Sequence, residues 1–261
     1  MKAWLRGPGV SALLSVLGLL AFWEFIARLN GGAGLSTPWE ALQALPQIFG
    51  DPEALGNILD SIRRMMIGFL LALLIATPIG LSMGRSPAVA ALLNPLLMVA
   101  YPVPKAALMP LIMLWLGVGD ASKILVIALG VALPLLYHSY QGARAVEQKM
   151  LWSAAAMGMG GVQRLFKVVL PASLPQILMG CRTGIVIGLI TMITSEMISR
   201  QKGAGNILFN ALDMAQYETV YAMILVIGAL GVVLDMGFEA IRVRLTRWAD
   251  HQPGLSAATS A

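Results

Sequence analysis

Residues 65–84 read MMIGFLLALLIATPIGLSMG, twenty consecutive positions without a charged side chain. A helix needs about 20 predominantly apolar residues to cross the hydrocarbon core of a bilayer, and this stretch meets that length. The rest of the chain has the same character, because 58% of its 261 residues are hydrophobic, 12% are charged and the mean hydropathy is +0.78. A soluble domain is about half apolar and about a quarter charged. The composition therefore predicts an all-α integral membrane protein.

Six stretches of the sequence are long and apolar enough to be membrane-spanning helices. The third contains an interruption. The first is too long for the apolar part of a signal peptide, and no small-residue cleavage site follows it, so we expect it to be retained. The six predicted spans cover approximately residues 10–29, 57–84, 88–116, 121–141, 174–198 and 217–241.

Lysine and arginine are distributed unequally between the two sets of connections. Ten lie in the N-terminal tail, the turn after the second span, the connection 142–173 and the C-terminal tail, whereas two lie in the other connections. Cytoplasmic connections carry an excess of basic residues. We therefore expect both termini and the connection 142–173 to be cytoplasmic, with the loop 30–56 on the other side.

These boundaries divide the chain into three parts. Residues 1–56 hold the first span and the extracytoplasmic loop, in which Ser36-Thr37-Pro38 is a typical helix start. Residues 57–244 hold the other five spans together with the cytoplasmic connection. Residues 245–261, which end in HQPGLSAATSA, are expected to form a disordered cytoplasmic tail.

The connection 142–173 is the largest predicted cytoplasmic feature. Residues 148–158, QKMLWSAAAMG, favour a helix, and the glycines at 158, 160 and 161 are expected to break or turn it. A second amphipathic stretch, VQRLFKVVL, follows, and Pro171 is expected to end it. The pattern predicts a helix–turn–helix across the cytoplasmic face. An ordinary amphipathic loop at the lipid headgroups is an equal alternative on these grounds.

Spacing within this connection narrows the interpretation. Nine residues separate Gly158 from the aliphatic Val168, and one residue separates Val168 from the pair Leu170-Pro171. This pattern resembles the signature of binding-protein-dependent ABC transporter permeases, in which Glu-Ala-Ala and three further residues precede the glycine. The positions that correspond to Glu-Ala-Ala hold Trp152, Ser153 and Ala154.

The resemblance extends over approximately residues 35–245. The segments PVPKAALMPLIMLWLGVGDASKI and LPQILMGCRTGIVIGLITMITSEMIS resemble the nitrate/sulfonate/taurine subgroup of these permeases. The resemblance implies the type I ABC importer permease fold in a bacterial inner (plasma) membrane. It implies as partners an ABC ATPase subunit dimer that carries ATP and Mg, a second permease copy forming a homodimer, and an extracytoplasmic substrate-binding protein. No cofactor is expected on this chain itself.

In this family the signature loop is the coupling helix, which docks into a cleft of the ATPase subunit. The resemblance implies that Gly158 lets the chain turn so that the helix end projects, and that Leu170-Pro171 returns it to the membrane. Trp152 departs from the family pattern, because the family has there an acid that pairs with a basic residue of the ATPase. Trp152 could instead fill an apolar pocket as an interface anchor.

The third span is interrupted by Tyr101-Pro102-Val103-Pro104-Lys105. Two prolines break a helix, and non-helical backbone at membrane depth is tolerated where it lines a cavity or is buried in protein. We therefore expect Tyr101, Pro102, Pro104 and Lys105 in the translocation pathway, where a cation favours an anionic solute. The alternative is that Lys105 snorkels or pairs with a carboxylate such as Glu196. Glu196 itself is either a pathway gate or part of a structural salt bridge.

Three glycines recur at four-residue spacing in the fifth span, at Gly180, Gly184 and Gly188. Small residues at this spacing let helices approach closely. We expect packing within one subunit, the alternative being the contact between two permease halves. Arg63 and Arg64, at the outer end of the second span, are expected to lie in the interface or to pair with Asp60, the alternative being contact with the binding protein.

Several function classes are excluded by what the sequence contains. One cysteine and two distant histidines supply no metal site, and the net charge of +5 reflects basic residues beside membrane ends rather than nucleic-acid binding. No Gly-x-x-x-x-Gly-Lys-Ser/Thr motif is present, so a partner must hydrolyse the ATP. We expect a non-enzymatic permease subunit that imports a small anionic solute by alternating access. An autonomous secondary transporter and an integral membrane enzyme are the alternatives.

Overall fold

The computed structural model describes residues 8–31 and 34–248, and every regular element within them is helical. The all-α prediction is therefore confirmed for this part of the chain. In chain order the elements are α1 (Pro8–Leu29), α2 (Pro38–Gly50), α3 (Pro52–Arg85), α4 (Pro87–Ala100), η2 (Lys105–Leu108), α5 (Met109–Leu116), α6 (Asp120–Ala145), α7 (Gln148–Ala156), α8 (Gly161–Arg164), η3 (Leu165–Val169), α9 (Leu170–Ser199), α10 (Ala204–Asp213) and α11 (Tyr217–Leu245).

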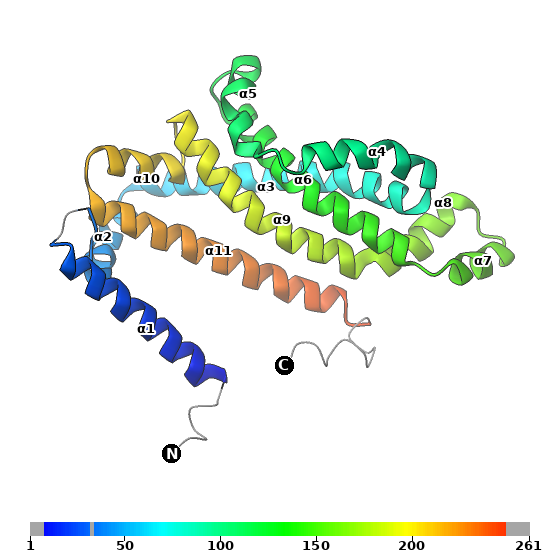
Figure 1. Cartoon of the computed structure of the whole chain (residues 1–261), viewed down its shortest axis with the longest axis horizontal. Helices are drawn as coiled ribbons and strands as arrows, with labels where there is room; N and C mark the ends of the chain where they lie inside the picture. The colour runs from blue at the N-terminus through cyan, green and yellow to red at the C-terminus, as the bar shows by residue number, and fades with distance from the viewer. Residues whose placement is uncertain (1–7, 32–33, 249–261) are drawn as a thin grey trace.

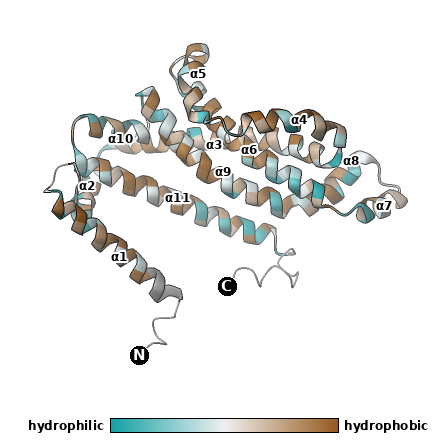
Figure 2. Cartoon of the chain, in the orientation of Figure 1, coloured by the Kyte–Doolittle hydropathy of each residue, from teal (hydrophilic) through white to brown (hydrophobic). Residues whose placement is uncertain are grey.

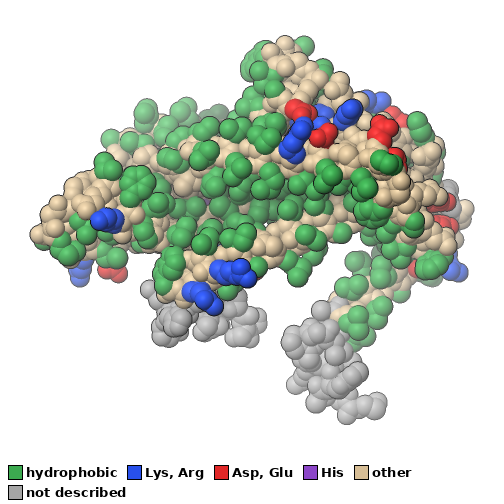
Figure 3. All heavy atoms as spheres, turned by 180° about the vertical axis from the view of Figure 1, so that it is seen from behind, with side chains coloured by type: hydrophobic (Ala, Val, Ile, Leu, Met, Phe, Trp, Pro, Cys, Tyr) green, Lys and Arg blue, Asp and Glu red, His purple; other side chains and the backbone are tan. Residues whose placement is uncertain are grey.

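The long helices run along the length of the molecule, with α2 and α10 at one end and α7 and α8 at the other (Figure 1). Hydrophobic residues colour most of α1, α4 and α5 (Figure 2), and hydrophobic side chains cover much of the opposite face (Figure 3). Four helical stretches in the described residues are long and apolar enough to cross a bilayer: α3, α6, α11 and the continuous run Gly161–Ser199.

The predicted third span is broken as expected. α4 and the segment Lys105–Leu116 meet at an angle of 82°, and together they make a fifth candidate span if the bent pair is counted as one. The predicted first span is helical as α1, but it is not among these candidates, so six spans remain a prediction. The predicted tail lies, from residue 249 onward, outside the described residues.

The core forms where α6 packs along α3 on one side and α9 on the other. Glycine makes this close approach possible: a Cβ at Gly80 would lie 2.5 Å from the Leu136 carbonyl oxygen, and one at Gly180 would lie 2.7 Å from the Cβ of His138. A Cβ at Gly184 or at Gly188 would lie 3.1 Å from Val131. The structure thus places the glycine row of α9 against α6 of the same chain.

α2 begins at the residues that the sequence indicated. The Thr37 hydroxyl accepts from the Glu40 N–H at 3.2 Å, and the Glu40 carboxylate accepts from the Thr37 N–H at 2.8 Å. This reciprocal capping box satisfies two backbone donors at the helix start, and Pro38 occupies a position where its missing N–H costs nothing.

Two local expectations are wrong. The connection between the predicted spans 174–198 and 217–241 was expected to be a loop, but it contains the helix α10, whose Ala204 and Gly205 are buried. Pro171 does not end a short helix, because α8, η3 and α9 form one continuous run. η3 is a π-helical turn in which the Leu170 N–H bonds to the Leu165 carbonyl, five residues back. Pro171 follows this shift in hydrogen-bond register, where its lack of an N–H is tolerated.

Candidate functional site

The segment that carries the signature spacing begins with two short helices, α7 and α8, and the chain turns between them at Gly158. α7 ends at Ala156, and the Gly158 N–H bonds to the Ala155 carbonyl at 2.9 Å. Gly158 adopts a φ of +82°, which residues with a Cβ rarely adopt. Gly160, by contrast, has a φ of −69°, so the reversal requires glycine at 158 and not at 160.

α7 has one buried face and one exposed face. Leu151 and Ala154 are buried, whereas Ser153 is exposed and Trp152 is 63% exposed. Met157, just before the turn, and Val162, after it, are also largely exposed. Exposed apolar patches of this kind mark interaction sites. We call Trp152, Met157 and Val162 the α7–α8 surface.

The remaining signature positions lie where the chain returns to the long helices. Val168 lies in η3 and Leu170 begins α9; both are partly buried, whereas Pro171 is exposed. Val169, between them, is almost fully buried and belongs to the main core. The sequence-predicted coupling residues are therefore brought together at one end of the molecule, beside α3.

A cavity of about 910 Å³ opens at the break in the third span. We call it the membrane cavity. Tyr101, Pro102 and Lys105 line it, whereas Pro104 and Glu196 are not among its lining residues. Its lining has no carboxylate and is Asn94, Leu97, Met98, Tyr101, Pro102, Val103, Lys105, Gly130, Leu133, Pro134, Tyr137, His138, Tyr140, Thr183, Ile187 and Thr191.

Lys105, which lines the membrane cavity, caps the C-terminal end of α4 at the break. Its ammonium donates to the Val103 carbonyl at 2.6 Å and to the Ala100 carbonyl at the end of α4. A cation is favoured at a helix C-terminus. An ammonium has three donors, and these contacts account for two of them. Lys105 therefore has a structural role even where it faces the cavity.

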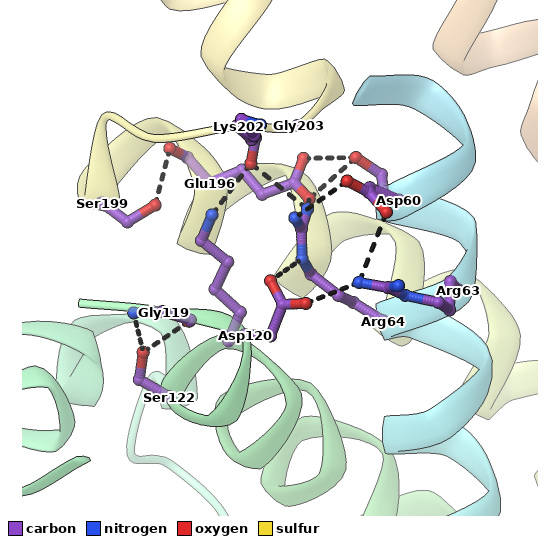
Figure 4. A network of polar contacts seen from close by, with 12 residues as sticks. Asp60, Arg63, Arg64, Gly119, Asp120, Ser122, Glu196, Ser199, Lys202 and Gly203 are labelled. Carbon is purple, nitrogen blue, oxygen red and sulfur yellow. Dashed lines mark hydrogen bonds and ion pairs between the residues drawn. The ribbon is translucent and has the colours of Figure 1, made fainter. Parts of the chain in front are cut away.

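Glu196 pairs with Arg64 instead, so the alternative pairing of Lys105 with Glu196 is wrong. The Arg64 guanidinium donates to Glu196 at 2.9 Å and to Asp120 at 2.6 Å. The Ser61 hydroxyl lies 2.7 and 2.8 Å from the two Glu196 oxygens, and the Gly205 N–H donates to the carboxylate at 3.0 Å. Figure 4 shows Arg64, Asp120 and Glu196 converging from α3, α6 and α9.

We call the connected charges Asp60, Arg63, Arg64, Asp120, Lys123 and Glu196 the ion-pair network. The expected pairing of both arginines with Asp60 is present, at 3.3 and 3.7 Å. The buried Lys123 joins through the backbone, because its ammonium and Arg64 both donate to the Lys202 carbonyl, at 2.9 and 3.2 Å. Sequence reasoning missed Asp120 and Lys123, although a lysine inside the fourth apolar run was a signal.

A second cluster of charges, also missed, joins α9 to α11. Arg182 donates to both oxygens of Asp235 at 2.7 Å and lies 3.4 Å from Glu239. Glu239 in turn accepts from Arg242. A bidentate arginine–carboxylate pair fixes orientation as well as distance. No group of His, Cys, Asp or Glu in the described part of the chain has the geometry to hold a metal ion.

Comparison with known proteins adds to this geometry. The family described as "Binding-protein-dependent transport system inner membrane component" matches residues 58–247. The chain is 33% identical to the taurine transport system permease protein TauC of Escherichia coli (strain K12), over 88% of this chain and 86% of TauC. It is 30% identical to the putative aliphatic sulfonates transport permease protein SsuC of Bacillus subtilis (strain 168), over 96% of this chain and 90% of SsuC.

The fold is also similar to that of a solved structure. A chain from an inward-facing structure of the MetNI methionine ABC transporter superposes with a TM-score of 0.65 at 13% sequence identity. The match covers 73% of this chain and 95% of the other. At this identity the likeness concerns the fold alone.

Proposed function

The chain belongs to the family of binding-protein-dependent transport system inner membrane components, and on that premise we propose that it is the permease subunit of an importer driven by a separate ABC ATPase dimer. The observation that carries the proposal is the α7–α8 surface. The signature spacing coincides with the short helix α7 and the turn at Gly158 that follows it. The apolar side chains of the α7–α8 surface are exposed, and α7 and α8 lie at one end of the molecule (Figure 1).

The α7–α8 surface is the proposed contact with the ATPase. Trp152 stands where the family has an acid and supplies an apolar anchor in place of an ion pair. Large aromatic side chains at the centre of an interface carry a large share of its binding energy. Closure of the ATPase dimer would then push on α7 and α8, and η3 would pass the displacement into α9, since α8, η3 and α9 form one continuous helical run.

The proposed pathway is the membrane cavity, completed by a second permease copy. Several large apolar side chains of α4 and α5 are exposed in the isolated chain, among them Leu92, Met98, Leu114 and Trp115. A second copy would cover such a surface and enclose the cavity. The solute would enter from an extracytoplasmic binding protein, and the cavity would open alternately to the two sides of the membrane.

The proposed solute is a small organic or inorganic anion of the sulfonate type. Two relatives carry names that refer to taurine and to aliphatic sulfonates. The cavity lining contains a lysine and a histidine but no carboxylate. A cavity lined by one sign of charge raises the local concentration of the opposite ion, which supports an anionic solute without selecting one.

Co-expression with candidate ATPase and binding-protein subunits tests the proposal. We expect Trp152→Ala to weaken ATPase association by about thirtyfold, the loss typical of a hot-spot residue of about 2 kcal/mol. Trp39→Ala is the matched control, because Trp39 is 65% exposed but lies on α2 at the opposite end. Equal effects of the two changes would contradict the assignment. Solute uptake by the chain alone in liposomes would instead favour an autonomous secondary transporter.

Six spans with both termini in the cytoplasm complete the proposal. Cys181 is the one cysteine in the sequence, so the Cys181→Ala variant is free of cysteine and serves as the background for labelling. We expect an impermeant maleimide added outside intact cells to label Gln43→Cys on α2 but not Lys149→Cys on α7, both positions being exposed. Labelling of Lys149→Cys from outside would contradict this topology and indicate the opposite orientation.

A further inference from the structure

A second groove, separate from the membrane cavity, lies where the last turns of α3 face α7, α8 and η3. Its volume is about 700 Å³, and none of its lining residues lines the membrane cavity. We call it the α3 groove. It is lined by Leu73, Leu74, Thr77, Pro78, Leu81, Ser82, Arg85, Ser86, Gln148, Leu151, Gly161, Arg164, Leu165, Phe166, Val169 and Leu170.

Two arginines, Arg85 and Arg164, line the α3 groove. Arg85 donates to the Ala143 carbonyl at 3.2 Å and to the Gln148 side-chain oxygen at 3.1 Å. Arg164 is partly buried, and its Nε is enclosed without a hydrogen-bond partner. Within the described residues, neither arginine lies within 4.0 Å of a carboxylate. Two cations that share a groove without a counter-charge favour an anion between them.

The rest of the α3 groove is apolar and open. Leu74 and Phe166 are both largely exposed at its sides. Leu73 lies twelve residues before Arg85, the last residue of α3, which is about 18 Å along a helix. This is close to the half-thickness of a hydrocarbon core of about 30 Å. The groove therefore runs from the end of a spanning helix to about the depth of one leaflet.

This combination indicates a lipid rather than a free ion or a protein. A free phosphate would use the arginines and leave the apolar length empty. The α7–α8 surface proposed for the ATPase shares no residue with the groove lining. Basic pockets between spanning helices bind the headgroups of anionic lipids, and the leucines offer contacts for an acyl chain.

We infer that the α3 groove binds one anionic phospholipid, with its phosphodiester between Arg85 and Arg164 and an acyl chain along Leu73, Leu74 and Leu81. Such a lipid touches α3 on one side and α8 and η3 on the other. It therefore stabilises the position of the coupling region against the bundle. The inference concerns the permease chain itself and does not rest on its pairing with an ATPase.

The test measures phosphatidylglycerol bound to the delipidated full-length chain by native mass spectrometry, with phosphatidylcholine of the same acyl length as the comparison. We expect phosphatidylglycerol to bind preferentially. The double variant Arg85→Gln/Arg164→Gln should weaken its binding by roughly tenfold to thirtyfold, because each cation contributes about a fivefold effect at a membrane surface. Glutamine retains a donor, and thermal unfolding checks that the variant is folded.

The control is Arg144→Gln/Lys149→Gln, which removes the same charge from exposed positions outside the groove. We expect it to bind the lipid as the unmodified chain does. Equal losses in the two double variants, or equal binding of the two lipids, would overturn the inference. Inorganic phosphate and short-chain dihexanoyl phosphatidylglycerol are then compared as competitors. If both displace the lipid at the same concentration, the groove is a simple phosphate site. Loss of the lipid on ATPase binding would assign the groove to the protein partner.

Discussion

The Arg64 guanidinium lies 2.9 Å from the Glu196 carboxylate, although 132 positions separate these residues in the chain. Both side chains are almost fully buried. The pair ties the first half of α3 to the end of α9, and Asp120 extends it to the first turn of α6. The three helices of the core are therefore connected by charge at the end opposite to α7 and α8 (Figures 1 and 4).

Arg64→Leu should destabilise the protein far more than the same change at the preceding residue. Removing Arg64 leaves the Glu196 carboxylate buried without its main partner, which costs about 3 kcal/mol. Arg63 makes similar contacts with Asp60 and Asp120, but its side chain is 57% exposed against 3% for Arg64. An exposed ion pair contributes about 1 kcal/mol or less.

Thermal unfolding of Arg64→Leu and Arg63→Leu in the same detergent provides the measurement. We expect a clearly lower midpoint for the Arg64 variant. The double variant Arg64→Leu/Glu196→Leu should lose less than the sum of the single variants, since it removes both buried charges. Equal midpoints for the Arg63 and Arg64 variants would show that the buried Arg64 contributes no more to stability than the exposed Arg63.

Gly80→Ala should weaken the packing of α3 against α6. The new Cβ would lie 2.5 Å from the Leu136 carbonyl and 2.7 Å from the Ser139 Cβ, and overpacking of this kind costs about 1–3 kcal/mol. Gly228→Ala on α11 is the control, because nothing lies within 4 Å of its Cβ position. Unfolding by denaturant should separate the two variants, and a stabilised Gly80→Ala would contradict the close approach.

Gly158→Val should uncouple ATP hydrolysis from uptake while leaving insertion intact. Valine is strained at a φ of +82°, so α7 and α8 would no longer reverse at the same point. Gly160→Val is the matched control, because its φ is −69° and its Cβ position is open. Reconstituted complexes should show lower uptake per ATP hydrolysed for the Gly158 variant alone. Normal coupling in the Gly158→Val variant would show that the turn at Gly158 is not required to couple ATP hydrolysis to uptake.

Lys105 combines a backbone contact with a charge, and two variants separate these roles. Lys105→Arg keeps the charge, whereas Lys105→Gln keeps a donor but loses the charge. If the charge serves an anionic solute, uptake should fall by about tenfold in the glutamine variant, equivalent to about 1.4 kcal/mol, and stay near normal in the arginine variant. ATPase association should not change. Normal uptake by Lys105→Gln would leave Lys105 with its structural role alone.

Local chemistry made several elements predictable. Pro102 and Pro104 indicated the break in the third span, and the capping residues Thr37 and Glu40 lie at the start of α2. α10 was missed because its ten residues are too few for a span, and it is held by packing of Ala204 and Gly205 against other helices. Pro171 was misjudged because the π-helical turn before it depends on the surrounding backbone.

Local residue patterns were enough to predict the class of protein, the long apolar helices and the position of the signature segment. These follow from hydrophobicity, proline and glycine, which act within a few residues of their own position. Helix packing brings Glu196 to Arg64 rather than to Lys105, buries Arg64 while Arg63 stays exposed, and places Arg85 and Arg164 in one groove. These features could not be predicted, because charge pairing and burial depend on which distant helices meet, and no local pattern records that.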